Sequence, residues 1–297
     1  MACPLCNHER ARPSWVGSTF YRGREFPYVQ CLSCHSLYCD PMPDDETLAV
    51  MYGPEYATSF EEDPGIDDPK EALRVVRWLR QETGGGTFVD YGCGAGSLLI
   101  EAARLSWQAI GVELDDEVAK EVERRTGARV VSDPHELADG VADILHLGDV
   151  IEHLTEVNRL MPQILRLIKP GGLLLAQGPL ENNATVFTAM LRLAKSLRRG
   201  TRTEMAPYHV MLATAHGQRT LFNRFGLEEL EYTVHEVAWP APNRLSFSDL
   251  SSPRAVGLFT ARRFSQAVSA LRPGRWGNRY FYAGRWNEGS GSDRSRV

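Results

Sequence analysis

From residue 87 onward, short apolar runs alternate with stretches of helical periodicity, and this alternation restricts the fold more than any other feature. Consecutive parallel strands need a crossover helix, so the pattern predicts a doubly wound α/β fold. The expected strands are residues 87–91, 109–113, 129–131, 142–147, 173–177, 227–235 and 255–261. The expected helices are residues 97–105, 116–126, 157–168, 186–197 and 218–225.

A glycine-rich loop, Asp90-Tyr91-Gly92-Cys93-Gly94-Ala95-Gly96, follows the first expected strand. Glycines without Cβ atoms permit a tight turn and let a ligand lie against the backbone. The spacing differs from the GxGxxG of dinucleotide folds, and the acidic Asp90 precedes the first glycine by two positions. The loop predicts a nucleoside cofactor site; the alternative is an ordinary turn between strand and helix.

Two further acidic residues follow expected strands. Glu113 ends the second strand, where a carboxylate can accept hydrogen bonds from both hydroxyls of a ribose. Asp133 follows the third strand and has two interpretations. It could accept a hydrogen bond from an adenine amino group, or it could cap a helix that begins at Pro134.

Four motifs in order resemble the class I S-adenosylmethionine (SAM)-dependent methyltransferases: residues 89–96, Glu113, residues 147–154 and residues 167–173. The resemblance implies a Rossmann-like seven-stranded methyltransferase domain. It also implies that Gly92, Gly94 and Gly96 wrap the methionine part of SAM and that Glu113 holds the ribose. Leu147 and Gly148 would line the amino-acid end, and Asp90 suits the cationic character of that end.

Four of the six cysteines form two pairs, Cys3-x2-Cys6 and Cys31-x2-Cys34. Each pair can direct two thiolates at one Zn²⁺ and so complete a closed, structural site in a zinc-ribbon-like module. Two unrelated thiol pairs are the alternative. His8, His35 and Cys39 lie close by and could replace a ligand.

These motifs divide the chain into four expected segments. Residues 1–42 form the zinc-binding module, residues 43–85 a helical lead-in, and residues 86–262 the methyltransferase domain. Residues 263–297 form a basic C-terminal tail, disordered from residue 284.

Charge and hydropathy narrow the class of protein. The net charge is −5, although residues 261–297 hold eight Arg against two acids, so the rest of the chain is strongly acidic. An acidic body disfavours a nucleic-acid substrate. No apolar run reaches the length that spans a bilayer and no secretory signal is visible, so we expect a cytoplasmic protein.

Two histidines are candidates for the general base of methyl transfer, His153 after the fourth strand and His209 in Pro207-Tyr208-His209. Each could instead be a packing or capping residue. The pair Glu152-His153 also resembles the acid-histidine pair of quinone O-methyltransferases, which can help to hold a divalent metal.

Residues 184–204 place apolar side chains on one helical face and basic side chains on the rest. Such a helix can lie on anionic lipid or meet a phosphorylated or lipid-linked substrate. The alternative is a helix packed on the sheet with a solvated outer face.

A zinc module joined to a methyltransferase domain resembles bacterial enzymes that methylate sugars and other small molecules. Cys31-Leu32-Ser33-Cys34, Pro41-Met42-Pro43 and Met51-Tyr52 carry this likeness. The expected function is SAM-dependent C-, O- or N-methylation of a small-molecule acceptor, such as a sugar or a natural-product or polysaccharide intermediate. The alternatives are an rRNA base methyltransferase with a zinc finger and a non-enzymatic SAM-binding scaffold. The sequence leaves the acceptor atom and the oligomeric state open.

Overall fold

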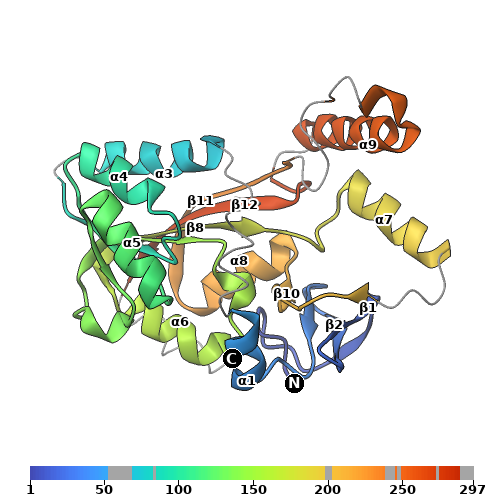
Figure 1. Ribbon diagram of the computed structural model, residues 1–297, viewed down its shortest axis with the longest axis horizontal. Helices are drawn as coiled ribbons and strands as arrows, with labels where there is room; N and C mark the ends of the chain where they lie inside the picture. Colours follow the sequence, from blue (N-terminus) through green and yellow to red (C-terminus); the bar gives the residue numbers. More distant parts are fainter. Residues whose placement is uncertain are drawn as a thin grey trace. The chain divides into compact units, whose positions relative to one another are not determined.

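The computed structural model describes residues 1–52, 69–82, 85–197, 203–237, 245, 249–271 and 274–287. The chain divides into two compact units (Figure 1). The first comprises Met1–Ile66, Pro179–Thr220 and Thr233–Tyr280, and the second comprises Asp67–Gly178, Leu221–Tyr232 and Phe281–Val297.

A seven-stranded sheet in the order β11-β12-β8-β7-β4-β5-β6 forms the centre of the second unit. The pairs β4–β5, β4–β7, β5–β6 and β7–β8 are parallel. The prediction of a seven-stranded α/β fold is therefore confirmed. The strands are β4 (Thr87–Tyr91), β5 (Gln108–Val112), β6 (Arg129–Val131), β7 (Ala142–Gly148), β8 (Ile168–Pro179), β11 (Leu227–His235) and β12 (Arg279–Trp286).

Helices cover both faces of this sheet, with α3 and α4 on one face and α6 on the other (Figure 1). The longer elements are α3 (Pro69–Gln81), α4 (Ser97–Arg104), α5 (Asp116–Thr126), α6 (Val157–Leu165) and α8 (Ala215–Arg224), with short 3₁₀ turns η1 (Pro134–Glu136) and η2 (Ile151–His153). The ends of α5 illustrate local control. Asp115 accepts from two backbone N–H groups at its start, and the left-handed Gly127 ends it.

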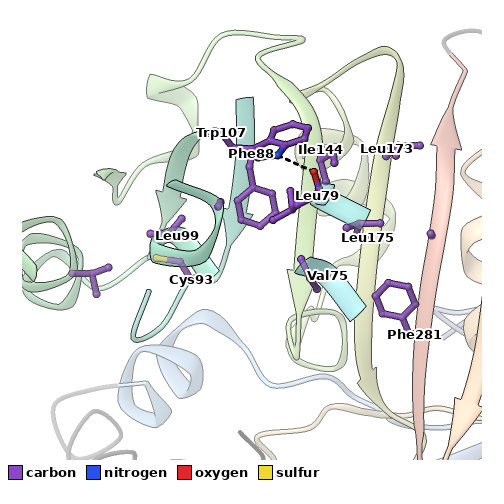
Figure 2. Packing of buried hydrophobic residues seen from close by; sticks show 13 residues of the cluster. Val75, Leu79, Phe88, Cys93, Leu99, Trp107, Ile144, Leu173, Leu175 and Phe281 are labelled. Carbon is purple, nitrogen blue, oxygen red and sulfur yellow. Dashed lines mark hydrogen bonds between the residues drawn. The ribbon is translucent and has the colours of Figure 1, made fainter. Parts of the chain in front are cut away.

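The core beneath α3 and α4 is built from large side chains on adjacent strands (Figure 2). Phe88 of β4, Ile144 of β7 and Leu173 of β8 are buried together with Leu79 of α3. The indole N–H of Trp107 donates to the carbonyl of Leu79 over 3.1 Å, which satisfies a polar group inside this apolar cluster.

The predicted seventh strand at residues 255–261 is wrong. These residues belong to α9 (Pro253–Ala270), where Ser252 accepts from the backbone N–H of Ala255 and Pro253 occupies the first turn. A capping serine followed by proline is a helix start, and it outweighs the short apolar run after it. The seventh strand is β12, so the segment predicted as a tail contains the end of α9 and a strand of the sheet. Residues 284–286 are ordered in β12; residues 288–297 lie outside the described part.

A second sheet in the order β10-β3-β2-β1-β9 lies in the first unit. β1 (Ala11–Tyr21) and β2 (Arg24–Cys31) form an antiparallel hairpin, and β3 (Leu37–Cys39) pairs with β2. β9 (Thr203–Glu204) and β10 (Met211–Leu212) extend the sheet beyond the predicted module of residues 1–42. The unit also contains α1 (Asp45–Met51), α7 (Val186–Leu197), α9 and the turn η3 (Asp249–Ser251).

Among the described residues, no helix combines the length and the apolar character that crossing a membrane requires.

Truncation of the buried Phe88 to alanine should lower the free energy of unfolding by about 3–5 kcal/mol, because it leaves a cavity beneath α3. Urea denaturation monitored by circular dichroism measures this change. Leu73→Ala on α3 is the control: Leu73 is 61% exposed, and its truncation should change the free energy by no more than about 0.5 kcal/mol. Equal effects of the two variants would contradict the assigned core.

Candidate functional site

The glycine loop between β4 and α4 turns through left-handed backbone at Gly92, Gly94 and Gly96, with φ of 75°, 47° and 71°. A Cβ atom on Gly96 would meet Val122 at 2.6 Å, and one on Gly92 would meet Val150 at 2.8 Å. A Cβ on Gly94 would meet no atom within 4 Å. Packing thus requires two of the glycines, whereas Gly94 keeps the loop open on one side for close approach of a ligand.

Glu113 directly follows β5, and its side chain contacts the glycine loop. Its Oε2 accepts from the backbone N–H of Gly94 over 3.1 Å. Burial raises the pKa of Glu113, and the N–H groups of Gly94 and Asp115 partly oppose that rise. The carboxylate is therefore positioned at the carboxyl edge of the parallel strands, beside the glycine loop.

Asp90 is buried at the end of β4 and pairs with a residue that sequence reasoning missed. Its Oδ1 lies 2.7 Å from Nδ1 of His146 on the neighbouring strand β7. The Nε2 atom of His146 is buried and has no hydrogen-bond partner among the described residues. The signal in the sequence was a polar side chain inside an otherwise apolar run at residues 144–147.

The other predicted cofactor residues lie on, or shortly after, strands of the same sheet. Gly148 ends β7, and a Cβ there would meet the His146 ring at 2.7 Å, so this ring requires the glycine. Leu147 is fully buried. Asp133 caps η1 by accepting from the backbone N–H of His135 over 2.8 Å, which corresponds to the helix-cap interpretation. Contact of Asp133 with adenine stays a prediction.

The four sulfur atoms of Cys3, Cys6, Cys31 and Cys34 all lie within 4.8 Å of one another. The Sγ atoms of Cys3 and Cys34 are 3.6 Å apart, and those of Cys6 and Cys31 are 3.5 Å apart. Tetrahedral Zn²⁺ with Zn–S bonds of about 2.3 Å separates its sulfur ligands by about 3.8 Å. The donor set and its spacing therefore fit one zinc ion. His8, His35 and Cys39 do not belong to this group in the described part of the chain.

Backbone hydrogen bonds shape both cysteine turns. The N–H of Cys3 donates to the carbonyl of His8, and the N–H of Cys31 donates to that of Ser36. Without a metal, the hydrogen bond from Cys3 lowers the pKa of Cys34 to about 5 and raises the pKa of Cys3. Burial raises the pKa of Cys6 to about 11. A bound metal would displace the remaining thiol protons.

The two candidate bases belong to different units. His153 ends η2 in the second unit, next to the buried Glu152. His209 lies in the first unit, and its Nδ1 is 3.0 Å from Oε2 of Glu181. Glu181 was not predicted, because it lies in the loop after β8 and only the fold brings it to His209.

Comparison with known proteins gives a family match over residues 68–232, to the model described as "Methyltransferase domain". The ribosomal protein L11 methyltransferase of Haemophilus ducreyi is 28% identical over 149 residues, covering 48% of this chain and 49% of the relative. The ubiquinone biosynthesis O-methyltransferase of Brucella ovis is 32% identical over 127 residues, covering 39% and 44%. The chain thus spans about half the length, or less, of these curated relatives.

Among solved structures, a SAM-dependent methyltransferase from Archaeoglobus fulgidus aligns with a TM-score of 0.48 and 16% identity, covering 78% of this chain and 99% of that one. The family match covers more than half of the residues, and it coincides with the glycine loop and the parallel sheet. The chain belongs to the methyltransferase domain family.

Proposed function

We propose that the protein transfers a methyl group from SAM to a small-molecule acceptor. The observation that carries this proposal is the contact of Glu113 with the N–H of Gly94, at the carboxyl edge of β4 and β5. Ligands of open α/β sheets bind at this edge, and a carboxylate there suits a ribose. The family match supports the same chemistry.

In this proposal Gly92, Gly94 and Gly96 surround the methionine part of SAM, and Asp90, held by His146, lies under its cationic end. Leu147 and Gly148 line that end as well. SAM supplies an electrophilic methyl group on a sulfonium. The chain then has to align the acceptor and exclude water, since an in-line displacement with a good leaving group depends mainly on geometry.

A general base is needed where the nucleophile loses a proton. We assign that role first to His209, because a partner carboxylate already orients its ring. His153 is the second candidate.

For the acceptor we propose a small molecule of the sugar, polysaccharide or natural-product kind, methylated on carbon, oxygen or nitrogen. The relatives are named for a ribosomal protein and for ubiquinone biosynthesis. Lipid contact through residues 184–204 finds support in Met190, Leu191 and Leu193, which are exposed on α7. Arg192 is engaged elsewhere, donating to Asn182, and residues 198–202 lie outside the described part.

A reducing compartment such as the cytoplasm suits six cysteines that form no disulfide among the described residues.

We propose that the four-cysteine group binds structural zinc, and we expect about one Zn²⁺ per chain. Cys3→Ser should remove the metal and disorder residues 1–40, because metal binding supplies folding free energy to so small a module. Elemental analysis and hydrogen exchange measure the two effects. Cys93→Ser, outside the group, is the control and should keep the zinc. Purified untagged protein without zinc would refute the site.

Glu113→Gln should weaken SAM binding by about 1–3 kcal/mol, since a neutral amide is a poorer acceptor for two hydroxyl groups.

The raised pKa of Glu113 should also make SAM affinity depend on pH. The ionised form binds ribose, so wild-type affinity should be complete above the raised pKa and fall as pH drops through it. That fall should begin above the usual range of glutamate and be absent in Glu113→Gln. Calorimetry across pH tests this, with the exposed Glu117→Gln as control. Unchanged affinity in a normally folded Glu113 variant would rule out the ribose contact.

If His209 is the general base, His209→Ala should slow the chemical step by roughly 10²–10⁴-fold while leaving SAM affinity nearly unchanged. Single-turnover kinetics with an acceptor found by screening sugars and natural-product precursors measures the step. His216→Ala, on the exposed side of α8, is the matched control. Normal rates in the His209 variant would transfer the assignment to His153 or remove it.

A further inference from the structure

The pair Glu181–His209 has the geometry of a base and its orienting group. Nδ1 of the histidine and Oε2 of the glutamate are 3.0 Å apart, and both side chains are about one-third exposed. An ionised carboxylate can only accept hydrogen bonds. Nδ1 must therefore donate, and in the neutral ring the lone pair is then on Nε2.

The loop that carries Glu181 is fixed by the next residue, Asn182, which is buried. Its Oδ1 accepts from the indole N–H of Trp15 and from the guanidinium of Arg192, both over 2.8 Å. Its Nδ2 donates to the carbonyl of His35 over 2.6 Å. Trp15 lies on β1 and His35 directly follows Cys34, so one amide joins the Glu181 loop to the cysteine module.

His209 is fixed by the same module from the other side. The hydroxyl of Tyr28 on β2 donates to the His209 carbonyl over 2.8 Å. The N–H of Cys39 donates to the carbonyl of Val210. Strand β10 begins two residues after His209 and pairs with β3. The chain that follows His209 therefore forms part of the same five-stranded sheet as β2 and β3 of the cysteine module.

A third attachment lies at Thr214, just beyond β10. Its hydroxyl donates to the carbonyl of Cys34 over 2.7 Å, and its N–H donates to the Ser36 hydroxyl over 3.0 Å. A Cβ on Gly217, in the first turn of α8, would collide with Ser36 and approach the sulfur of Cys34. The second cysteine turn thus packs directly against the chain that follows His209.

We propose that Glu181 is a positioning residue that keeps His209 in the tautomer with Nδ1 protonated, and that the four-cysteine module holds the two residues together through Asn182 and Thr214. Nε2 is then the nitrogen that receives a proton from the acceptor. The catalytic consequence rests on the proposed function; the tautomer itself does not. The module thus acts on the acceptor side of the enzyme without touching the reacting atoms.

The test is long-range ¹H–¹⁵N correlation of the histidine rings in full-length, zinc-loaded protein, at a pH where the rings are neutral. Loss of one ring system in His209→Asn assigns the signals. Wild-type protein should show Nδ1 protonated and Nε2 bare. Glu181→Gln keeps the shape but offers an amide N–H, so the ratio of this tautomer to the other should fall roughly tenfold or more. An unchanged ratio, or a wild-type ring protonated on Nε2, would overturn the role of Glu181.

The module's part is tested by Asn182→Ala, which keeps Glu181 but removes the bonds to Trp15 and His35. We expect a similar loss of the single tautomer, with zinc retained. If Asn182→Ala does not fold, Thr214→Val tests the second attachment. Arg12→Ala removes an exposed contact with Gln30 on the same sheet and should change nothing. A fixed tautomer in a folded Asn182 or Thr214 variant would refute the module's role.

Calorimetry of SAM binding in the same samples separates the positioning of His209 from the proposed function. Failure to bind SAM would refute the proposed function alone.

Discussion

The parallel ladders that join β4 to β5 and to β7 are the interactions on which the cofactor half of the molecule depends. Their register places Asp90 opposite Gly111 on one side and opposite His146 on the other. The same register brings Glu113 to the loop that follows β4. A slip of one residue would turn every side chain of β4 to the opposite face, which would take Phe88 out of its core cluster and separate Asp90 from His146. The large apolar side chains of the core therefore specify the site as well as the stability.

Most of this half could be predicted from sequence because its strands are buried on both faces and appear as short apolar runs. The seventh strand could not. Its aromatic residues Tyr280, Phe281 and Tyr282 lie between glycines and arginines that resemble a tail, whereas residues 255–259 form an apolar run inside a helix. Local composition identified the wrong segment because tertiary contacts decide which segment joins the sheet. β12 lies between β11 and β8, and pairing with these two strands is not visible in the composition of residues 279–286.

The site residues divide in the same way. The glycines and Glu113 follow from a local pattern, since backbone conformation and ribose chemistry each require a particular residue type at a fixed place. His146 and Glu181 follow from neither. Asp90 and His146 are 56 positions apart, and Trp15 and Asn182 are 167 apart, so these contacts exist only once two distant segments are adjacent. Spacing along the chain carries no signal for such pairs.

The first unit raises a different physical question, because it buries several polar side chains beside its apolar ones. Asn182, Asn183, Ser36 and Thr214 are all buried, and each makes hydrogen bonds to backbone of another segment. A network of this kind adds little net stability but tolerates few alternative arrangements, since any shift leaves a buried polar group unsatisfied. Zinc, by closing Cys3, Cys6, Cys31 and Cys34 around one point, would supply the stability that the network lacks. The metal would then provide free energy, and the buried amides and hydroxyls would provide specificity for the one arrangement in which the module holds the segments of Glu181 and His209.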